Sequence, residues 1–266
     1  MVRVRPAAVA GKFYPADPEV LRRTIGDMLD DGAPSEPDVA PELLIVPHAG
    51  YIYSGSVAAS AYRLLLGVIK VVRRVALLGP SHFVAQQGLA SPGVDLLATP
   101  LGEIPVDREL AATAMMSSIV GDNPVAHARE HSLEVQLPFL RIILGDLSVL
   151  PLLTGRVRPE AAADVLEAVT TGDDVIGIIS SDLSHYLDFD AARQRDARTA
   201  MLITELRPGD LSPDDACGRT AVQAALIVAR RKGWVCRVLD LGNSGDTVGS
   251  MDRVVGYGAF VIGPEI

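Results

Sequence analysis

The sequence predicts an α/β fold in which a mostly parallel central sheet is flanked by helices. Short apolar runs of strand length alternate with longer stretches of helical periodicity along the whole chain. Three of these runs, residues 43–47, 75–80 and 175–179, are each followed closely by a histidine. The strands of an open parallel sheet end at one edge, where ligands bind. With no internal repeat and no linker of disordered composition, residues 1–266 are expected to form a single domain.

In the N-terminal part, the clearest element is a helix from about residue 18 to residue 29. Asp17 can cap it, and Pro18 suits its first position. A loop rich in proline and aspartate is expected at 31–41. Three prolines spaced through residues 88–107 interrupt the alternation and predict a hairpin excursion. The other elements expected here are strands at 42–46 and 75–79 and an amphipathic helix at 56–66.

In the C-terminal part, the same alternation continues to the end of the chain. Apolar residues at helical spacing predict five helices, at residues 107–118, 133–144, 159–171, 189–206 and 215–232. Short runs rich in apolar residues predict four strands, at residues 147–153, 175–180, 235–241 and 254–262.

Composition excludes several classes of function. The formal net charge of −9 argues against general nucleic-acid binding, which usually shows a basic stripe. No apolar run approaches the ~20 residues of a membrane span, and the first residues lack the apolar core of a secretory signal. Cys217 and Cys236 fit neither a disulfide framework nor a paired Cys-x-x-Cys metal site. A cytoplasmic location is therefore expected.

Two histidines that follow neighbouring strand patterns are the first candidates for chemistry. His48 precedes a run of small residues with two glycines, which leaves room above a sheet edge. His82 repeats the arrangement after the next strand. A single such histidine could equally be hydrogen-bonded within its loop, but two of them favour a shared site.

Two further segments carry clustered polar side chains. In residues 180–186, the Asp182 carboxylate could orient the His185 imidazole, or the segment could be a helix-capping turn. At the start of the helix expected near residue 133, His127 and His131 are four residues apart. We favour a capping and surface role for this pair, with Glu130 and His131 supporting a nearby site.

Cys217 lies at the expected start of an apolar helix. A helix N-terminus stabilises a thiolate, which suits a metal ligand or a nucleophile, although a small buried cysteine is the common alternative. No Gly-x-Ser-x-Gly elbow supports a serine hydrolase, and no phosphate-binding glycine motif is present. Residues 242–246 could contact a ligand or simply form a turn.

Several motifs in order resemble the Memo family, also called AmmeMemoRadiSam system protein B. They extend from residue 5 to residue 262, so the resemblance covers nearly the whole chain. The matching stretches are RPAAVAGKFYP at 5–15, PHAGY at 47–51, GPSH at 79–82, EHSLE at 130–134, SSDLSH at 180–185, ACGR at 216–219, SGD at 244–246 and RVVGY at 253–257.

The resemblance implies a class III extradiol dioxygenase-like fold, similar to LigB-type enzymes that open catechol rings with Fe(II). By resemblance, the metal ligands here are His48, His82 and Cys217, and Asp182 and His185 line the same cavity. The dioxygenases use a carboxylate where this chain has a cysteine. Iron(II) is the expected metal, while a thiolate also suits copper or zinc.

The leading functional hypothesis is therefore a metal-binding oxidoreductase with His185, positioned by Asp182, as the general acid/base. The side chains expected to contact substrate are Tyr51, Glu130, His131 and Asp246. One alternative is a catalytically inactive module that binds a small molecule or peptide in the same pocket. Another is a metal- or thiol-dependent hydrolase. The family name further implies association with radical-SAM and AMMECR-type proteins.

Overall fold

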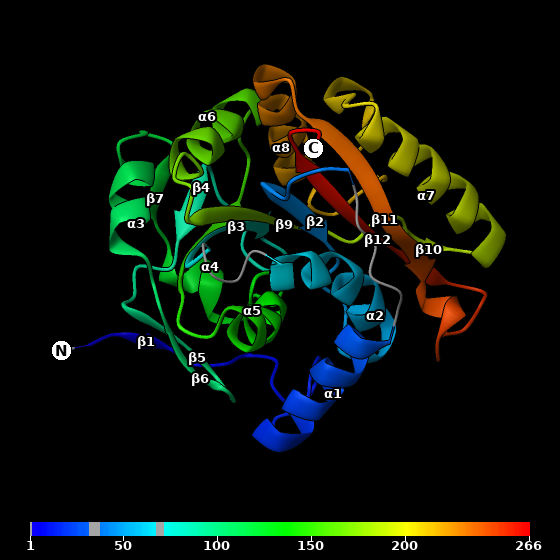
Figure 1. Cartoon of the computed structure of the whole chain (residues 1–266), viewed down its shortest axis with the longest axis horizontal. Coiled ribbons are helices and arrows are strands. Elements are labelled where there is room, and N and C mark those ends of the chain that lie inside the picture. The colour runs from blue at the N-terminus through cyan, green and yellow to red at the C-terminus, as the bar shows by residue number, and fades with distance from the viewer. Residues whose placement is uncertain (1, 32–37, 68–71) are drawn as a thin grey trace.

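The computed structural model describes residues 2–31, 38–67 and 72–266 (Figure 1). Residues 32–37 of the loop expected at 31–41 lie outside this range. The described residues form one central sheet of nine strands, with helices on both faces, and a separate three-stranded sheet. Within the same range, no helix combines the length and apolar character required to cross a membrane.

Four parallel strands form the centre of the large sheet. Their spatial order is β2 (Leu43–Val46), β9 (Val175–Ser180), β3 (Arg74–Pro80) and β8 (Ser148–Thr154). Outside this centre, β12 (Val254–Gly263) runs antiparallel to β2. The prediction of a mostly parallel sheet therefore holds for the centre, while the whole sheet is mixed.

The flanking strands explain the mixed character. β11 (Val235–Asn243) and β12 are consecutive in the chain and pair antiparallel along most of their length. On the other side, β4 (Leu89–Ser91) pairs antiparallel with β8. For β11 and β12 the cause is local, because no crossover α-helix lies between them; β4 and β8 are instead distant in the chain. Two short strands complete the sheet: β7 (Val120–Asp122) is parallel to β4, and β10 (His185–Leu187) is antiparallel to β12.

The hairpin predicted within residues 88–107 is confirmed, and it belongs to the small sheet rather than the large one. β5 (Leu96–Thr99) and β6 (Gly102–Pro105) form an antiparallel hairpin, and β5 also pairs with β1 (Val4–Arg5). β1 precedes the helix at 18–29, which is the first element expected from the sequence.

Two helical layers bury the two faces of the sheet (Figure 1). α1 (Pro18–Asp30), α2 (Tyr51–Tyr62) and α5 (Leu137–Leu144) pack on one face, and α6 (Pro159–Val169) and α8 (Arg219–Lys232) on the other. Along β2, alternate side chains enter the two separate cores. Burial on both faces explains why these strands appear as continuous apolar runs in the sequence. The remaining α-helices are α3 (Arg108–Met115), α4 (Pro124–Ala128) and α7 (Phe189–Thr204).

Most predicted helices and strands are found, with shifts at some boundaries. Asp17 caps α1 by accepting from the backbone N–H groups of Glu19 and Val20, as predicted. α2 begins at Tyr51, five residues before the expected start, because the Tyr51 backbone N–H donates to the Phe13 carbonyl and orders the turn. The helix expected at 133–144 divides into a 3-10 turn, Glu134–Gln136, and α5.

A buried ion pair ties the N-terminal segment to the segment that precedes α5. The Glu134 carboxylate lies 2.7 Å from Arg5 Nη1 and accepts the Tyr14 hydroxyl at the same distance. It also accepts two backbone N–H groups, from Ala8 and Val9. The Arg5 guanidinium in turn donates to the backbone carbonyls of residues 127 and 130. None of the buried side-chain nitrogen and oxygen atoms of Arg5, Tyr14 and Glu134 is left without a hydrogen-bond partner.

We expect Glu134→Gln to lower the free energy of unfolding by about 3–5 kcal/mol, because it leaves the Arg5 charge buried without its counter-ion. Urea denaturation followed by circular dichroism measures this change. Glu205→Gln is the matched control, since Glu205 pairs with Arg207 at an exposed position and its loss should cost at most about 1 kcal/mol. Equal losses in the two variants would show that the buried pair contributes nothing specific.

Candidate functional site

Three adjacent strands bring their carboxyl ends to the candidate site. His48 follows β2, Ser180 ends β9, and His82 follows β3, with β9 between the other two. The ring centroids of His48 and His82 are 5.2 Å apart. The predicted convergence of these two histidines at one sheet edge is therefore confirmed, and it follows from the parallel register of the central strands.

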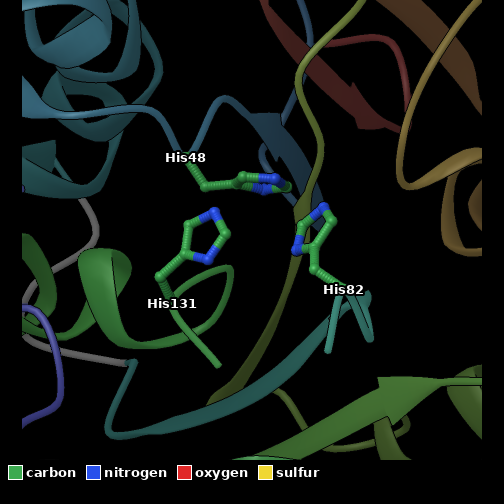
Figure 2. A group of neighbouring side chains, drawn as sticks. All are labelled: His48, His82 and His131. Atoms are coloured by element: carbon green, nitrogen blue, oxygen red, sulfur yellow. The ribbon is translucent and has the colours of Figure 1, made fainter. Parts of the chain in front are cut away.

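His131 completes a cluster of three imidazoles. Figure 2 shows the three rings facing one another, and one ring nitrogen of each lies within 4.8 Å of the others. The surface role favoured for His127 and His131 is wrong, whereas His131 does line the cavity of the site that it was also expected to support. His127 is buried, with Nε2 2.8 Å from the Ala90 carbonyl, and His131 stacks on His82. α4 ends at Ala128 and the chain turns before residue 134, so the spacing of four does not place the two imidazoles together.

The buried Glu130 carboxylate holds His82 and the turn that carries His131. One carboxylate oxygen lies 2.9 Å from His82 Nδ1 and accepts the backbone N–H groups of His131 and Ser132; the other accepts the His82 backbone N–H. Burial raises the pKa of Glu130, but these hydrogen bonds outweigh it and hold the pKa at about 2. Glu130 was expected to contact substrate; the structure places its carboxylate behind the His82 ring.

His48 is held from both its backbone and its ring. Its backbone N–H donates to Asp182 Oδ1 at 2.7 Å, and its Nδ1 lies 2.9 Å from Ser180 Oγ. Burial lowers the pKa of His48 to about 3, and the neighbouring His82 lowers it further. Burial likewise lowers the pKa of His131 to about 4. Both imidazoles are therefore neutral at neutral pH, which is the form that binds metal ions.

A cavity of about 600 Å³ opens in front of the three histidines. Its lining includes two residues predicted to be catalytic, Asp182 and His185. The predicted contact between them is absent: His185 Nδ1 lies 2.9 Å from the Leu183 carbonyl, and Asp182 accepts from the backbone of His48 instead. The chain enters β10 at His185, so the three-residue spacing does not make a carboxylate–imidazole pair.

Cys217 lies beside His48, as the resemblance implied. The distance from Cys217 Sγ to His48 Nε2 is 3.3 Å, and the Asp182 backbone N–H donates to the same sulfur. Burial raises the pKa of the Cys217 thiol to about 12, and the Asp182 carboxylate adds to this effect. The sulfur is therefore a thiol in the metal-free protein.

The comparison with known proteins decides the family. The model of Memo-like proteins matches residues 5–261. The chain belongs to the Memo family. A MEMO1 family protein of Aquifex aeolicus is 35% identical over 270 residues, covering 96% of this chain and 98% of the relative. MEMO1 family proteins of Methanopyrus kandleri and Sulfolobus acidocaldarius are each 34% identical and cover 97% and 96% of this chain and 98% and 97% of their own lengths.

Two residues predicted to contact substrate lie away from the histidine cavity of this Memo-family chain. The Tyr51 side chain is buried, and its hydroxyl donates to the Val135 carbonyl. Asp246 accepts from the Asn243 backbone N–H in a capping turn and lines a separate cavity of about 450 Å³. Neither residue lines the cavity in front of the three histidines.

Gly218 allows the close approach that places Cys217 in the site. Its backbone N–H donates to Ser181 Oγ at 2.9 Å, and an added Cβ would lie 2.7 Å from the Ser180 carbonyl oxygen. Its φ of −88° is open to any residue, so the requirement for glycine here is steric.

We expect Gly218→Ala to lower the free energy of unfolding by about 1–3 kcal/mol, because the new methyl group overpacks against β9. Gly209→Ala is the matched control, since an added Cβ there meets no heavy atom within 4 Å. The control should leave stability unchanged or raise it by up to about 1 kcal/mol. Chemical denaturation of both variants makes the comparison, and a tolerated Gly218→Ala would contradict the steric argument.

Proposed function

We propose that His48, His82 and His131 bind an iron(II) ion, with the Cys217 sulfur as a further donor, in a redox enzyme acting on a small phenolic substrate. The observation that carries the proposal is the convergence of three imidazoles from separate segments on one cavity. Burial keeps at least two of the three neutral, so they need not lose a proton before binding a metal.

The hydrogen bonds behind the rings fit a metal site. His48 and His82 each use Nδ1 for a protein partner, Ser180 and Glu130 respectively. This leaves Nε2 of both rings as the donor atom, and an imidazole backed by a carboxylate is a recurrent arrangement at metal sites. Two nitrogens bound to one ion lie no more than about 4 Å apart. The candidate donor atoms of the three rings lie within 4.8 Å of one another, which is close to that limit.

The donor set favours a transition metal. Imidazole suits iron, copper and zinc, and a thiolate strengthens binding of the softer ions. Iron(II) held here would supply open coordination positions and a route for electrons from the aromatic ring to O2.

His185 is the residue we assign to proton transfer. It lines the cavity, and its Nδ1 is anchored at the Leu183 carbonyl, so Nε2 is the nitrogen left to exchange a proton. A carbonyl oxygen only accepts, which places the ring hydrogen on Nδ1 and makes Nε2 a base for a substrate hydroxyl. Asp182 is not assigned to proton transfer; its carboxylate accepts the His48 backbone N–H and so helps to position that residue.

For the metal site, we expect His48→Ala and His131→Ala each to weaken iron(II) binding by at least about 100-fold, more than the loss of a supporting residue costs. Anaerobic titration measures the affinity, and metal analysis of protein purified without chelators identifies the resident ion. His127→Gln is the matched control, because His127 is buried outside the cluster. A wild-type protein that takes up no iron, copper or zinc would overturn the proposal, and a fully binding His131→Ala would remove His131 from the ligand set.

For the reaction, we expect the iron-loaded protein to consume oxygen with catechols but not with resorcinol, whose hydroxyls are not adjacent. His185→Gln should keep the metal and lower kcat by about 10²–10⁴-fold, because proton transfer is lost. An oxygen electrode measures the oxygen uptake with each substrate and the kcat of each variant. Absence of uptake with any catechol, at confirmed iron loading, would eliminate the dioxygenase reaction while leaving metal binding in place.

A thiol-dependent hydrolase is the second candidate, and one contact favours it. Cys217 Sγ lies 3.3 Å from His48 Nε2, and Ser180 orients the same ring, which is the arrangement of a nucleophile, base and orienting group. In the redox candidate His48 Nε2 binds the metal, whereas in the hydrolase candidate the same nitrogen takes the proton of the Cys217 thiol. Hydrolysis of activated esters by chelator-treated protein, abolished by Cys217→Ser and inhibited by added metal, would favour the thiol reaction over the redox reaction.

A further inference from the structure

A chain of buried side chains extends behind His48, away from the cavity. The Tyr62 hydroxyl lies 2.9 Å from Gln136 Oε1, Gln136 Nε2 lies 2.8 Å from Ser180 Oγ, and Ser180 Oγ lies 2.9 Å from His48 Nδ1. None of the four side chains is more than 1% exposed. Because water does not reach these atoms, each hydrogen must be placed within the chain itself.

The orientation of the Gln136 amide follows from its neighbours. Gln136 Nε2 is also 2.9 Å from the Pro47 carbonyl oxygen. A carbonyl oxygen only accepts, so the NH₂ group is the end that faces Pro47 and Ser180. The amide oxygen then accepts the Tyr62 hydroxyl. Both amide hydrogens are used, one for the Pro47 carbonyl and one for Ser180.

The direction of the Ser180 hydroxyl follows in the same way. Ser180 Oγ lies 2.6 Å from the Ser132 carbonyl oxygen, a distance that requires a hydrogen between the two oxygens. The single hydroxyl hydrogen is therefore committed to Ser132. The two lone pairs of Ser180 receive one hydrogen from Gln136 and one from His48 Nδ1. If the hydroxyl donated to His48 instead, two oxygens would face each other at 2.6 Å without a hydrogen.

We propose that Tyr62, Gln136 and Ser180 are positioning residues that lock His48 in the tautomer with its hydrogen on Nδ1. This lock directs the Nε2 lone pair toward Cys217 and the other two histidines. Without such partners, a neutral imidazole exchanges between two tautomers, and only one of them offers Nε2 to a ligand. The effect on metal affinity rests on the proposed function, but the tautomer itself does not.

A neutral partner suits His48 for an electrostatic reason. Asp182 is buried beside it and accepts its backbone N–H. A second carboxylate behind the ring, like the one behind His82, would place two buried acidic groups close together, and each would raise the cost of ionising the other. The serine–glutamine–tyrosine chain holds the tautomer without adding a charge. The two strand-end histidines are thus oriented by chemically different partners.

The first test uses the metal-free wild-type protein labelled with ¹⁵N-histidine, with His48→Gln to assign the resonance. We expect a pyrrole-type shift at His48 Nδ1 and a pyridine-type shift at Nε2. The reverse pattern would overturn the inference. This measurement needs no metal, so it remains decisive even if the protein proves not to bind one.

The second test uses Ser180→Ala and Tyr62→Phe, with Ser54→Ala as the matched control. Ser54 is a buried serine whose hydroxyl donates to the Ala49 carbonyl outside the chain of four. We expect Ser180→Ala to give a mixture of His48 tautomers and about 10–100-fold weaker iron(II) binding. Tyr62→Phe should give a smaller change in the same direction, and the control should give none.

A Ser180→Ala protein with a single Nδ1–H tautomer would show that the chain does not set the tautomer. If Ser180→Ala fails to fold, the wild-type spectrum still tests the tautomer of His48, and Tyr62→Phe tests the chain behind it. An unchanged His48 spectrum in Tyr62→Phe would remove Tyr62 and Gln136 from the proposal.

Discussion

The candidate site depends on one buried carboxylate, that of Glu130. It bonds to the backbone and ring of His82, which follows β3 and lies 48 residues before Glu130 in the chain. It also accepts the backbone N–H groups of His131 and Ser132 in its own turn. Burying a carboxylate is costly, and several N–H donors offset that cost. The same bonds fix the His82 ring and the turn that carries His131. Two members of the cluster therefore have their positions set by one group.

The neighbouring Glu134 extends this arrangement to the rest of the molecule. Its ion pair with Arg5 joins the N-terminal segment to the segment between α4 and α5, and Arg5 also bonds to the Glu130 carbonyl. The two glutamates, four residues apart, thus have different partners. Glu130 fixes His82 and the turn of His131, and Glu134 anchors the N-terminal segment through Arg5. Because one turn contains both, a change that loosens the N-terminal segment is expected to reach the cluster.

Burial gives the site its chemical character. It keeps the imidazoles of His48 and His131 neutral and the Cys217 sulfur protonated in the metal-free protein. The histidines are thereby ready to bind a metal, whereas the thiol must first lose its proton. Since His48 Nε2 faces both the other histidines and Cys217, this atom is where the metal-dependent and thiol-dependent reactions would compete.

Local sequence patterns are enough to predict the α/β class, most helices and central strands, and the convergence of His48 and His82. These follow from hydrophobic periodicity and from the common edge at which parallel strands end, both of which are visible in local patterns. Cys217 was placed beside them by resemblance alone. The membership of His131 in the imidazole cluster, the separation of Asp182 from His185 and the antiparallel flanks of the sheet become visible in the folded chain. Each of these depends on a turn or a pairing between distant segments, and neither residue spacing nor periodicity records which way a turn directs the chain.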